Sequence, residues 1–285
     1  MDKTTMTARQ LLVRKERVGR IFIFKDDRWK KSLKKGATHA ILPLLLLVGW
    51  QLTGMLGTVS KTVLPTPLDI VQAFYHLAVS GELATHLKIS VFRAAAGFLL
   101  GAGLGIVAGI AVGFSTKTEG VLDSTLQMLR TIPHLAVAPL FILWFGFGEA
   151  SKILLIAKGA FFPIYVNTFL GIRGVDAKLF DVARILHFSQ WKKIKLLILP
   201  SALPNILLGI RLSLGAAWLA LVVAELMGST EGIGYMMMDA RQFSNTDIVF
   251  VGIIIFAAVG KLTDSFVRLL EKRLLRWQDT YKGSI

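Results

Sequence analysis

Six long apolar stretches dominate the sequence, and polar residues gather between them. Each stretch has about 20 residues, which is the length that an α-helix needs to cross the hydrocarbon core of a bilayer. Such a pattern predicts an all-α membrane protein with six transmembrane helices, because helices satisfy their own backbone polar groups in lipid. The expected spans are residues 38–57, 90–114, 123–145, 152–171, 204–227 and 247–267.

The basic residues between these spans predict the orientation of the chain. With six spans, the N-terminal segment, the 115–122 and 172–203 loops and the C-terminal segment lie on one side, and together they hold 24 Lys and Arg residues. The segments on the other side hold 3. Lys and Arg favour the cytoplasmic side of a membrane. Both termini are therefore expected in the cytoplasm.

Composition agrees with a membrane protein and excludes other classes. Hydrophobic residues make up 54% of the 285 positions, charged residues make up 18%, and the formal charge is +15. Such basicity alone is typical of a nucleic-acid binder, but a nucleic-acid binder has no use for apolar runs of this length, so no nucleic-acid partner is expected. Cysteine is absent, which excludes disulfides, thiolate zinc sites and cysteine nucleophiles.

The expected domains follow from these two patterns. Residues 38–270 form the transmembrane domain, flanked by basic cytoplasmic segments at 1–37 and 271–285. The first basic segment contains Ile21 to Phe24, an apolar patch that could lie on anionic lipid. A loosely ordered tail that only sets the orientation is an equally good interpretation of this segment.

Two local patterns predict how the helices pack. The second span has glycine at every fourth position, which leaves a smooth stripe along which a neighbouring backbone can approach closely. We expect this stripe to serve helix packing rather than to line a pathway. Leu64 to Phe74 contains two prolines followed by Asp69 and a helix-period apolar pattern, which predicts an amphipathic helix along the outer surface. The glycines of the stripe are Gly97, Gly101, Gly105, Gly109 and Gly113.

The loop at residues 174–203 is longer than a connection between neighbouring helices requires. Its pattern predicts two helical pieces, Asp176 to Leu186 and Trp191 to Leu199, with Pro200 and Pro204 ending the second. A pair of helices standing clear of the membrane is a plausible docking surface for a soluble partner.

This loop resembles the coupling motif of binding-protein-dependent ABC importer permeases. The family pattern is Glu-Ala-Ala, three residues, Gly, nine residues, Ile-x-Leu-Pro. Here Asp181 replaces Glu, Val182 replaces the first Ala and His187 replaces Gly. Because Gly adopts left-handed backbone angles that His adopts reluctantly, either the turn is not left-handed or His187 is strained. The residues that the resemblance assigns to ATPase coupling are Asp181, Val182, Ala183, Arg184, His187, Leu197, Leu199 and Pro200.

The resemblance extends over nearly the whole chain from about residue 40. Its motifs are similar to those of permeases for sulfonates, taurine and nitrate, and most similar to those for aliphatic sulfonates. It implies a type I ABC importer permease fold with a coupling-helix loop, in the bacterial plasma (inner) membrane. It also implies a second permease copy, two ATPase subunits and an extracytoplasmic substrate-binding protein. The motifs include Leu64 to Pro67, Ser80 to Leu83, Gln127 to His134, Ile142 to Gly146, Phe162 to Thr168, Ala224 to Glu225, Gly232 to Tyr235, Asp239 to Arg241, Gly260 to Leu262 and Leu274 to Trp277.

The sequence lacks the motifs of an ATPase or of a metal enzyme. A P-loop requires Gly-x-x-x-x-Gly-Lys-Ser/Thr, whereas Gly260-Lys261 is followed by Leu262. No two histidines share a span, so no metal site is expected. We therefore predict a transport subunit without a cofactor of its own, with ATP and Mg²⁺ bound by a partner chain.

Polar residues inside the spans are candidates for the translocation path, because charge within a membrane is rarely left facing lipid. Arg130 and His134, one helical turn apart in the third span, could face an anionic substrate. Alternatively, Arg130 extends to the interface or pairs with Glu225. We expect Glu225 and Asp264 to pair with Arg or Lys. The candidate path residues are Arg130, Pro133, His134, Trp144, Asn167 and Glu225, although Trp144 also fits an interfacial aromatic and Asn167 an interhelical amide.

Two other classes of protein remain open on the sequence. An ion-coupled secondary transporter would favour inverted repeats and intramembrane carboxylates on broken helices. A membrane-anchored regulatory protein would use the basic N-terminal segment. Within the permease family, cargo other than sulfonate, such as taurine or nitrate and bicarbonate, shares most of the motifs.

Overall fold

A computed structural model of the chain describes residues 41–277, and the chain divides into two compact units, Met1–Leu68 and Asp69–Ile285. The predicted basic segment 1–37, and residues 278–285 of the predicted C-terminal segment, lie outside the described residues. Every regular element in the described range is a helix. After a first helix at Ile41–Met55, the elements are α2 (Pro67–Val79), α3 (Glu82–Phe114), α4 (Thr116–Arg130), α5 (His134–Phe145), α6 (Glu149–Arg173), α7 (Ala177–Ile185), α8 (Gln190–Lys193), the π-helix η1 (Ile194–Ile198), α9 (Leu199–Gly228), α10 (Ile233–Gln242) and α11 (Thr246–Leu274).

The described part of the first unit, residues 41–68, is a short apolar helix followed by a connection that folds back on it. The Trp50 indole N–H donates to the Pro65 carbonyl oxygen at 3.0 Å. The Leu68 amide donates to the Gln51 side-chain oxygen at 3.2 Å. The helix Ile41–Met55 has 15 described residues and spans about 22 Å at 1.5 Å per residue.

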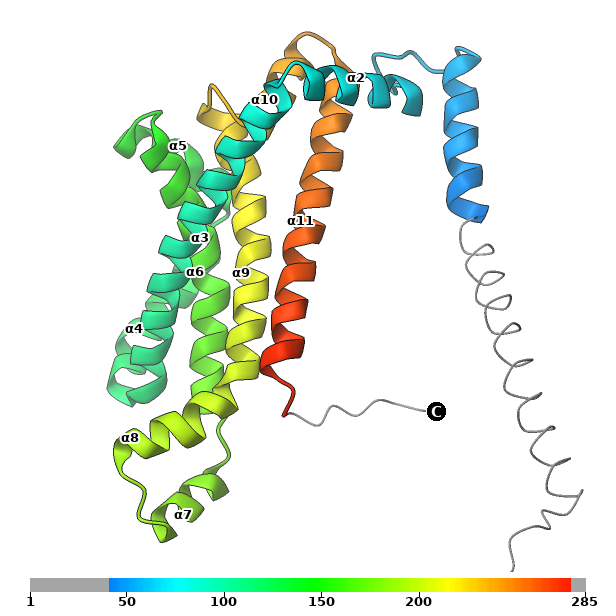
Figure 1. The fold of residues 1–285 in the computed structure, drawn as a ribbon. Coiled ribbons are helices and arrows are strands. Elements are labelled where there is room, and N and C mark those ends of the chain that lie inside the picture. The colour runs from blue at the N-terminus through cyan, green and yellow to red at the C-terminus, as the bar shows by residue number, and fades with distance from the viewer. Residues whose placement is uncertain (1–40, 278–285) are drawn as a thin grey trace, which may run out of the picture. The chain divides into compact units, whose positions relative to one another are not determined.

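Four long helices, α3, α6, α9 and α11, form the bundle of the second unit (Figure 1). The helices α3 and α6 lie side by side and run parallel, because successive glycines of α3 meet successive positions of α6. Gly97 faces Ile156, Gly105 faces Phe161 and Ile164, and Gly113 faces Ile172. A Cβ atom at Gly105 would lie 2.6 Å from the Phe161 carbonyl oxygen, so the helices approach at backbone distance. The predicted packing role of the glycine stripe is visible in this contact.

The parallel contact between α3 and α6 determines what α4 and α5 do. Since α3 ends at the end of the bundle where α6 also ends, the chain must return along the bundle before α6 begins. The helices α4 and α5 make this return, but they are bent by 100° at a break over residues 131–133. The expected single span 123–145 is therefore wrong as a continuous helix, and the bent pair takes its place.

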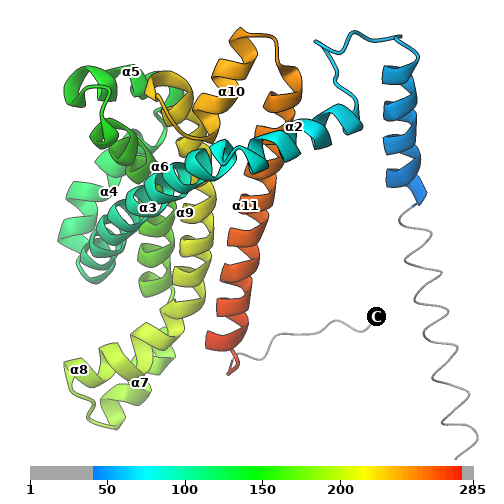
Figure 2. The same ribbon diagram turned by 45° about the horizontal axis from the view of Figure 1, so that its top comes forward.

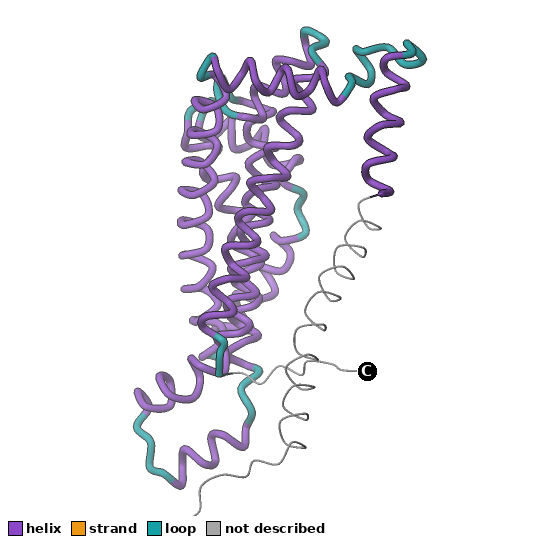
Figure 3. The backbone as a smooth tube through the Cα atoms, turned by 45° about the vertical axis from the view of Figure 1, so that its right-hand side comes forward, coloured by secondary structure: helices purple, strands orange, loops and turns teal. Residues whose placement is uncertain are grey.

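The remaining long helices alternate in direction. Gly171 meets Ala202 and Gly159 meets Ala220, so α9 runs antiparallel to α6. The Trp218 indole donates to the Phe256 carbonyl at 2.9 Å, and Arg211 pairs with Asp264, so α11 runs antiparallel to α9. As a result α7 and α8 stand at one end of the bundle, and α10 lies at the opposite end (Figures 2 and 3).

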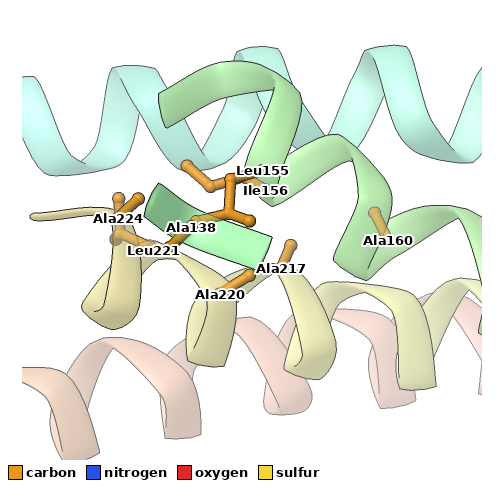
Figure 4. Close-up of a cluster of buried hydrophobic side chains, with 8 residues drawn as sticks. All are labelled: Ala138, Leu155, Ile156, Ala160, Ala217, Ala220, Leu221 and Ala224. Atoms are coloured by element: carbon orange, nitrogen blue, oxygen red, sulfur yellow. The ribbon is translucent and has the colours of Figure 1, made fainter. Parts of the chain in front are cut away.

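Small residues fill the centre of the bundle, where α5, α6 and α9 meet. Alanine makes up most of the buried cluster, which lets three helices approach closely without large side chains between them (Figure 4). The cluster consists of Ala138, Leu155, Ile156, Ala160, Ala217, Ala220, Leu221 and Ala224.

The described residues contain four helices long and apolar enough to span a membrane, or five when the bent pair counts as one span. These correspond to the second to sixth predicted spans, with wider bounds. The first predicted span begins at residue 38, before the described range, so a sixth span stays a prediction. Pro200 and Pro204 do not end the helical piece before them, contrary to expectation. Pro200 is the second residue of α9, which follows the π-helix η1 directly, Pro204 lies inside α9, and the helix continues through both prolines.

Candidate functional site: the α7–α8 loop and the polar groups of the bundle

The α7–α8 loop folds as two short helices with regular ends. The Asp176 side chain accepts a hydrogen bond from the Lys178 amide at 2.9 Å and begins α7. The Ser189 hydroxyl caps α8 in the same way, by accepting from the Lys192 amide. Caps of this kind satisfy backbone donors that a helix start leaves free. The first predicted helical piece is thus present, and the second continues through η1 into α9.

The end of α7 resolves the question raised by His187. Its φ angle is 50°, so the turn is left-handed and the histidine occupies a position that favours glycine. The His187 amide donates to the Arg184 carbonyl, and the Phe188 amide donates to the Ala183 carbonyl at 2.9 Å. These two bonds make a Schellman motif, which closes the helix and directs the chain toward α8.

Apolar side chains on this loop face outward. Ala183 is buried, whereas Ile185 and Trp191 are each 76% exposed. Asp181 and Arg184 are exposed and form an ion pair at 3.4 Å along α7. An exposed surface that combines large apolar groups with charges is typical of a protein interaction site. The other predicted coupling residues continue from this surface, since Val182 and Leu199 are exposed, and Leu197 and Pro200 are half-buried where η1 meets α9.

A second polar group lies in the other half of the bundle, and sequence reasoning found only one of its members. The Arg93 side chain of α3 is 2% exposed and pairs with Glu225 of α9 at 3.0 Å and with Glu149 of α6 at 2.6 Å. Its guanidinium also donates to the Glu231 carbonyl at 2.5 Å. Lys152 pairs with Glu149 at 3.3 Å. Arg93 thereby connects three helices and the loop that precedes α10.

Glu225 is held by neutral donors as well. The Ser90 hydroxyl donates to it at 2.7 Å, and the Gly234 amide donates at 2.8 Å. A Cβ atom at Gly232 would overlap the Glu225 carboxylate, so only glycine fits there. The expected pairing of Glu225 with a basic residue is present, but the partner is Arg93 rather than Arg130. Nothing in the sequence spacing signals a pair 132 residues apart.

The predicted path residues Arg130 and His134 do not share a helix face. Arg130 is the last residue of α4 and is exposed, with a 3.5 Å contact to the Gln127 side chain. His134 begins α5 beyond the break, and its Nε2 atom is buried without a hydrogen-bond partner among the described residues. The prediction of a common face is wrong because Pro133, which stands before α5, ends the continuous helix.

The other candidate path residues lie apart from one another. Trp144 is 64% exposed near the end of α5. The Asn167 amide donates to the Pro163 carbonyl of its own helix at 2.7 Å, so the expected interhelical hydrogen bond is absent from its described contacts. Asp264 pairs with Arg211 across α9 and α11 at 2.6 Å and with Arg268 at 2.8 Å, as expected for an acidic residue in this position. The described residues contain no group of three His, Asp or Glu side chains that could hold a metal ion.

Comparisons with known proteins identify the family. Residues 101–276 match the family described as the binding-protein-dependent transport system inner membrane component. The protein named as the aliphatic sulfonates transport permease SsuC of Bacillus subtilis (strain 168) is 67% identical over 255 residues, which cover 90% of each chain. The taurine transport system permease protein TauC of Escherichia coli (strain K12) is 35% identical over 256 residues, which cover 88% of this chain and 93% of TauC.

The fold comparison agrees with the sequence comparisons. A chain of the MetNI methionine ABC transporter in an inward-facing conformation matches with a TM-score of 0.51 at 16% identity, covering 66% of this chain and 96% of that chain. The chain therefore belongs to the inner membrane components of binding-protein-dependent transport systems and has the fold of an ABC importer permease. It is an integral membrane transport subunit rather than an enzyme, as predicted.

Proposed function

We propose that this chain forms the membrane pathway of an ABC importer that moves a small organic anion, an aliphatic sulfonate, into the cytoplasm. The observation that carries the proposal is the α7–α8 loop, which stands beyond one end of the bundle with exposed apolar and charged side chains. The choice of cargo rests on similarity, since identity to the sulfonate permease is about twice the identity to the taurine permease.

The proposed assembly has two copies of this chain, two ATPase subunits that bind ATP and Mg²⁺, and an extracytoplasmic binding protein. In this assembly the α7–α8 loop contacts the ATPase through Asp181 and its neighbours. Both termini and the α7–α8 loop are cytoplasmic, which agrees with the distribution of 24 and 3 basic residues between the two sides. The opposite end of the bundle, with α10, faces the binding protein.

An uptake experiment tests the cargo. A strain that lacks its own permeases for these anions would express the chain with its ATPase and binding protein, and uptake of labelled alkanesulfonate, taurine and nitrate would be compared. We expect alkanesulfonate to accumulate fastest. Faster uptake of taurine or nitrate would contradict the proposed cargo, and transport by the purified chain without an ATPase would contradict the importer mechanism itself.

Asp181→Lys tests the docking assignment. Reversing an exposed charge at a complementary interface opposes the partner's charge and weakens binding, so we expect at least a tenfold loss of uptake and reduced ATPase co-purification, with normal membrane insertion. Glu82→Lys makes the same charge change in the first turn of α3, at the opposite end of the bundle, and should retain the ATPase. Wild-type uptake by Asp181→Lys would exclude this loop as the docking site.

A further inference from the structure

Lys158 carries a charge near the middle of a membrane-spanning helix. It lies in α6, about 14 Å from the start of that helix at 1.5 Å per residue. The hydrocarbon core of a bilayer is about 30 Å thick, so the length of α6 places Lys158 within the core and near its middle. An ionisable residue at this depth is costly and is retained where it serves a function.

Lys158 is partly buried, and its surroundings differ from those of Arg93, Lys152 and Arg211 in the spanning helices. Arg93 and Lys152 have carboxylate partners, and Arg211 has Asp264. Within residues 41–277, Lys158 has no carboxylate at ion-pair distance. Its contacts there are the Ile132 carbonyl oxygen at 2.9 Å and the face of the Phe162 ring at 6.0 Å. A single carbonyl dipole and an aromatic face leave most of the positive charge uncompensated.

The Ile132 carbonyl places this charge at the break between α4 and α5. Thr131, Ile132 and Pro133 of the break are exposed, so the break is accessible from outside the packed bundle. His134 follows directly, and its buried Nε2 atom would lie 3.0 Å from a Cβ atom at Gly159, the residue after Lys158. Lys158 and His134 therefore sit on the same side of α6, beside an interrupted helix.

The break adds favourable electrostatics for an anion. The first turn of α5 begins after Pro133 without a side-chain cap, and the amides of a helix start carry partial positive charge. In secondary transporters, discontinuous helices point their N-termini at anionic substrate groups near the midplane, and the start of α5 has the same polarity. The Lys158 ammonium and the uncapped start of α5 both attract an anion, and the His134 Nε2 atom beside them has no hydrogen-bond partner among the described residues.

We propose that Lys158, with His134 and the α4–α5 break, forms an anion contact in the translocation path that receives the sulfonate headgroup during transport. This assignment rests on the proposed import of sulfonates. Lys158 binds the headgroup transiently by exchanging its carbonyl partner for sulfonate oxygens.

The test uses the complete importer in proteoliposomes, with its ATPase and binding protein, and measures uptake of labelled alkanesulfonate and ATP hydrolysis together. Lys158→Gln keeps a hydrogen-bond donor toward Ile132 but removes the charge. Lys158→Arg keeps the charge. We expect Lys158→Gln to reduce sulfonate moved per ATP hydrolysed at least tenfold, while binding-protein-stimulated hydrolysis stays within about twofold, and Lys158→Arg to restore most of the uptake.

Lys261→Gln is the matched control, because Lys261 is an exposed lysine of the spanning helix α11, and its uptake should equal that of the wild type. Wild-type transport by Lys158→Gln would overturn the anion contact. Equal loss of uptake and hydrolysis with a lower unfolding temperature would also overturn it, because that result would mean that Lys158 stabilises the α4–α5 break and does not bind the substrate. Failure of the wild-type importer to move sulfonate would instead overturn the proposed function.

Discussion

Arg93 holds two carboxylates that differ in their access to solvent. The Glu225 side chain is 0% exposed and the Glu149 side chain is 47% exposed. Desolvation of Arg93 and Glu225 costs several kcal/mol, which their mutual attraction repays only while both remain in place. Loss of either residue therefore leaves the other charge buried without its partner and removes this connection between α3 and α9, in the half of the bundle that contains α10.

Arg93→Met should destabilise the bundle by about 3–5 kcal/mol, because it leaves Glu225 buried without a counter-charge. The matched control is Arg268→Met at an exposed ion pair, where Asp264 keeps Arg211 as a partner, and it should cost at most about 1 kcal/mol. Unfolding temperatures of both purified variants in detergent test the comparison. Equal shifts would show that burial of the Arg93 pair contributes nothing extra.

His187 shows what a motif can predict at the scale of one residue. Its departure from glycine raised two alternatives, strain or a turn of different hand, and the angle of 50° selects strain. A non-glycine residue in the left-handed region costs roughly 1–2 kcal/mol. The partner of Glu225 could not be predicted in this way, because pairing depends on which faces of α3 and α9 meet, and the sequence specifies each face without specifying its neighbour.

At the scale of helices, the glycine stripe of α3 defines the closest contact in the bundle. A side chain at Gly101 would overlap the Ala157 backbone, whereas Gly103 on the same helix has open space. Gly101→Ala should therefore destabilise the protein by about 1–3 kcal/mol through overpacking. Gly103→Ala, the control, should be neutral or stabilise the helix by up to about 1 kcal/mol.

Thermal unfolding in detergent would separate these two variants, and cross-linking between α3 and α6 would show whether the contact persists. If Gly101→Ala unfolds at the wild-type temperature, the helices are free to separate slightly, and the stripe is not a tight contact. If Gly103→Ala is the more damaging variant, the exposed face of α3 packs against a partner in the membrane.

The break between α4 and α5 is the place where the predicted continuous helix over residues 123–145 is wrong. Averaged hydropathy over residues 123–145 hides the interruption, since the residues around it are apolar enough to continue a span. Pro133 was the local signal, because proline disfavours helical angles in the residue before it. The same residue type did not interrupt α9 at Pro204. Proline therefore marks a candidate break, but its presence alone does not decide whether the helix is interrupted there.

At the scale of the whole molecule, the ends of the helices divide the connections into two groups. The α7–α8 loop and the ends of α3 and α11 share one end of the bundle, and the loop before α10 lies at the other (Figure 1). The six predicted spans imply this division, and the distribution of Lys and Arg predicts which side is cytoplasmic. The sequence could not predict that α3 and α6 are neighbours. The positive-inside rule gives the orientation of each span across the membrane but carries no information on which spans pack together.

Single cysteines test the orientation, since the natural chain has no cysteine. Ser189→Cys lies in the α7–α8 loop and Thr230→Cys lies in the loop before α10, and both positions are exposed. An impermeant maleimide should label Thr230→Cys on intact spheroplasts and Ser189→Cys only after the membrane is opened. Labelling of both positions from the same side would contradict the proposed topology.

The parallel contact between α3 and α6 has a consequence for biosynthesis. Neighbouring antiparallel helices can enter a membrane together as a hairpin. The contact between Gly97 and Ile156, in contrast, cannot form until Ile156 has been synthesised. At about 5–20 residues per second, roughly 60 residues take between about 3 and 12 seconds. During that interval the glycine stripe of α3 lacks its contact with α6. The helix α3 is therefore synthesised several seconds before α6, which is the helix that its glycine stripe contacts.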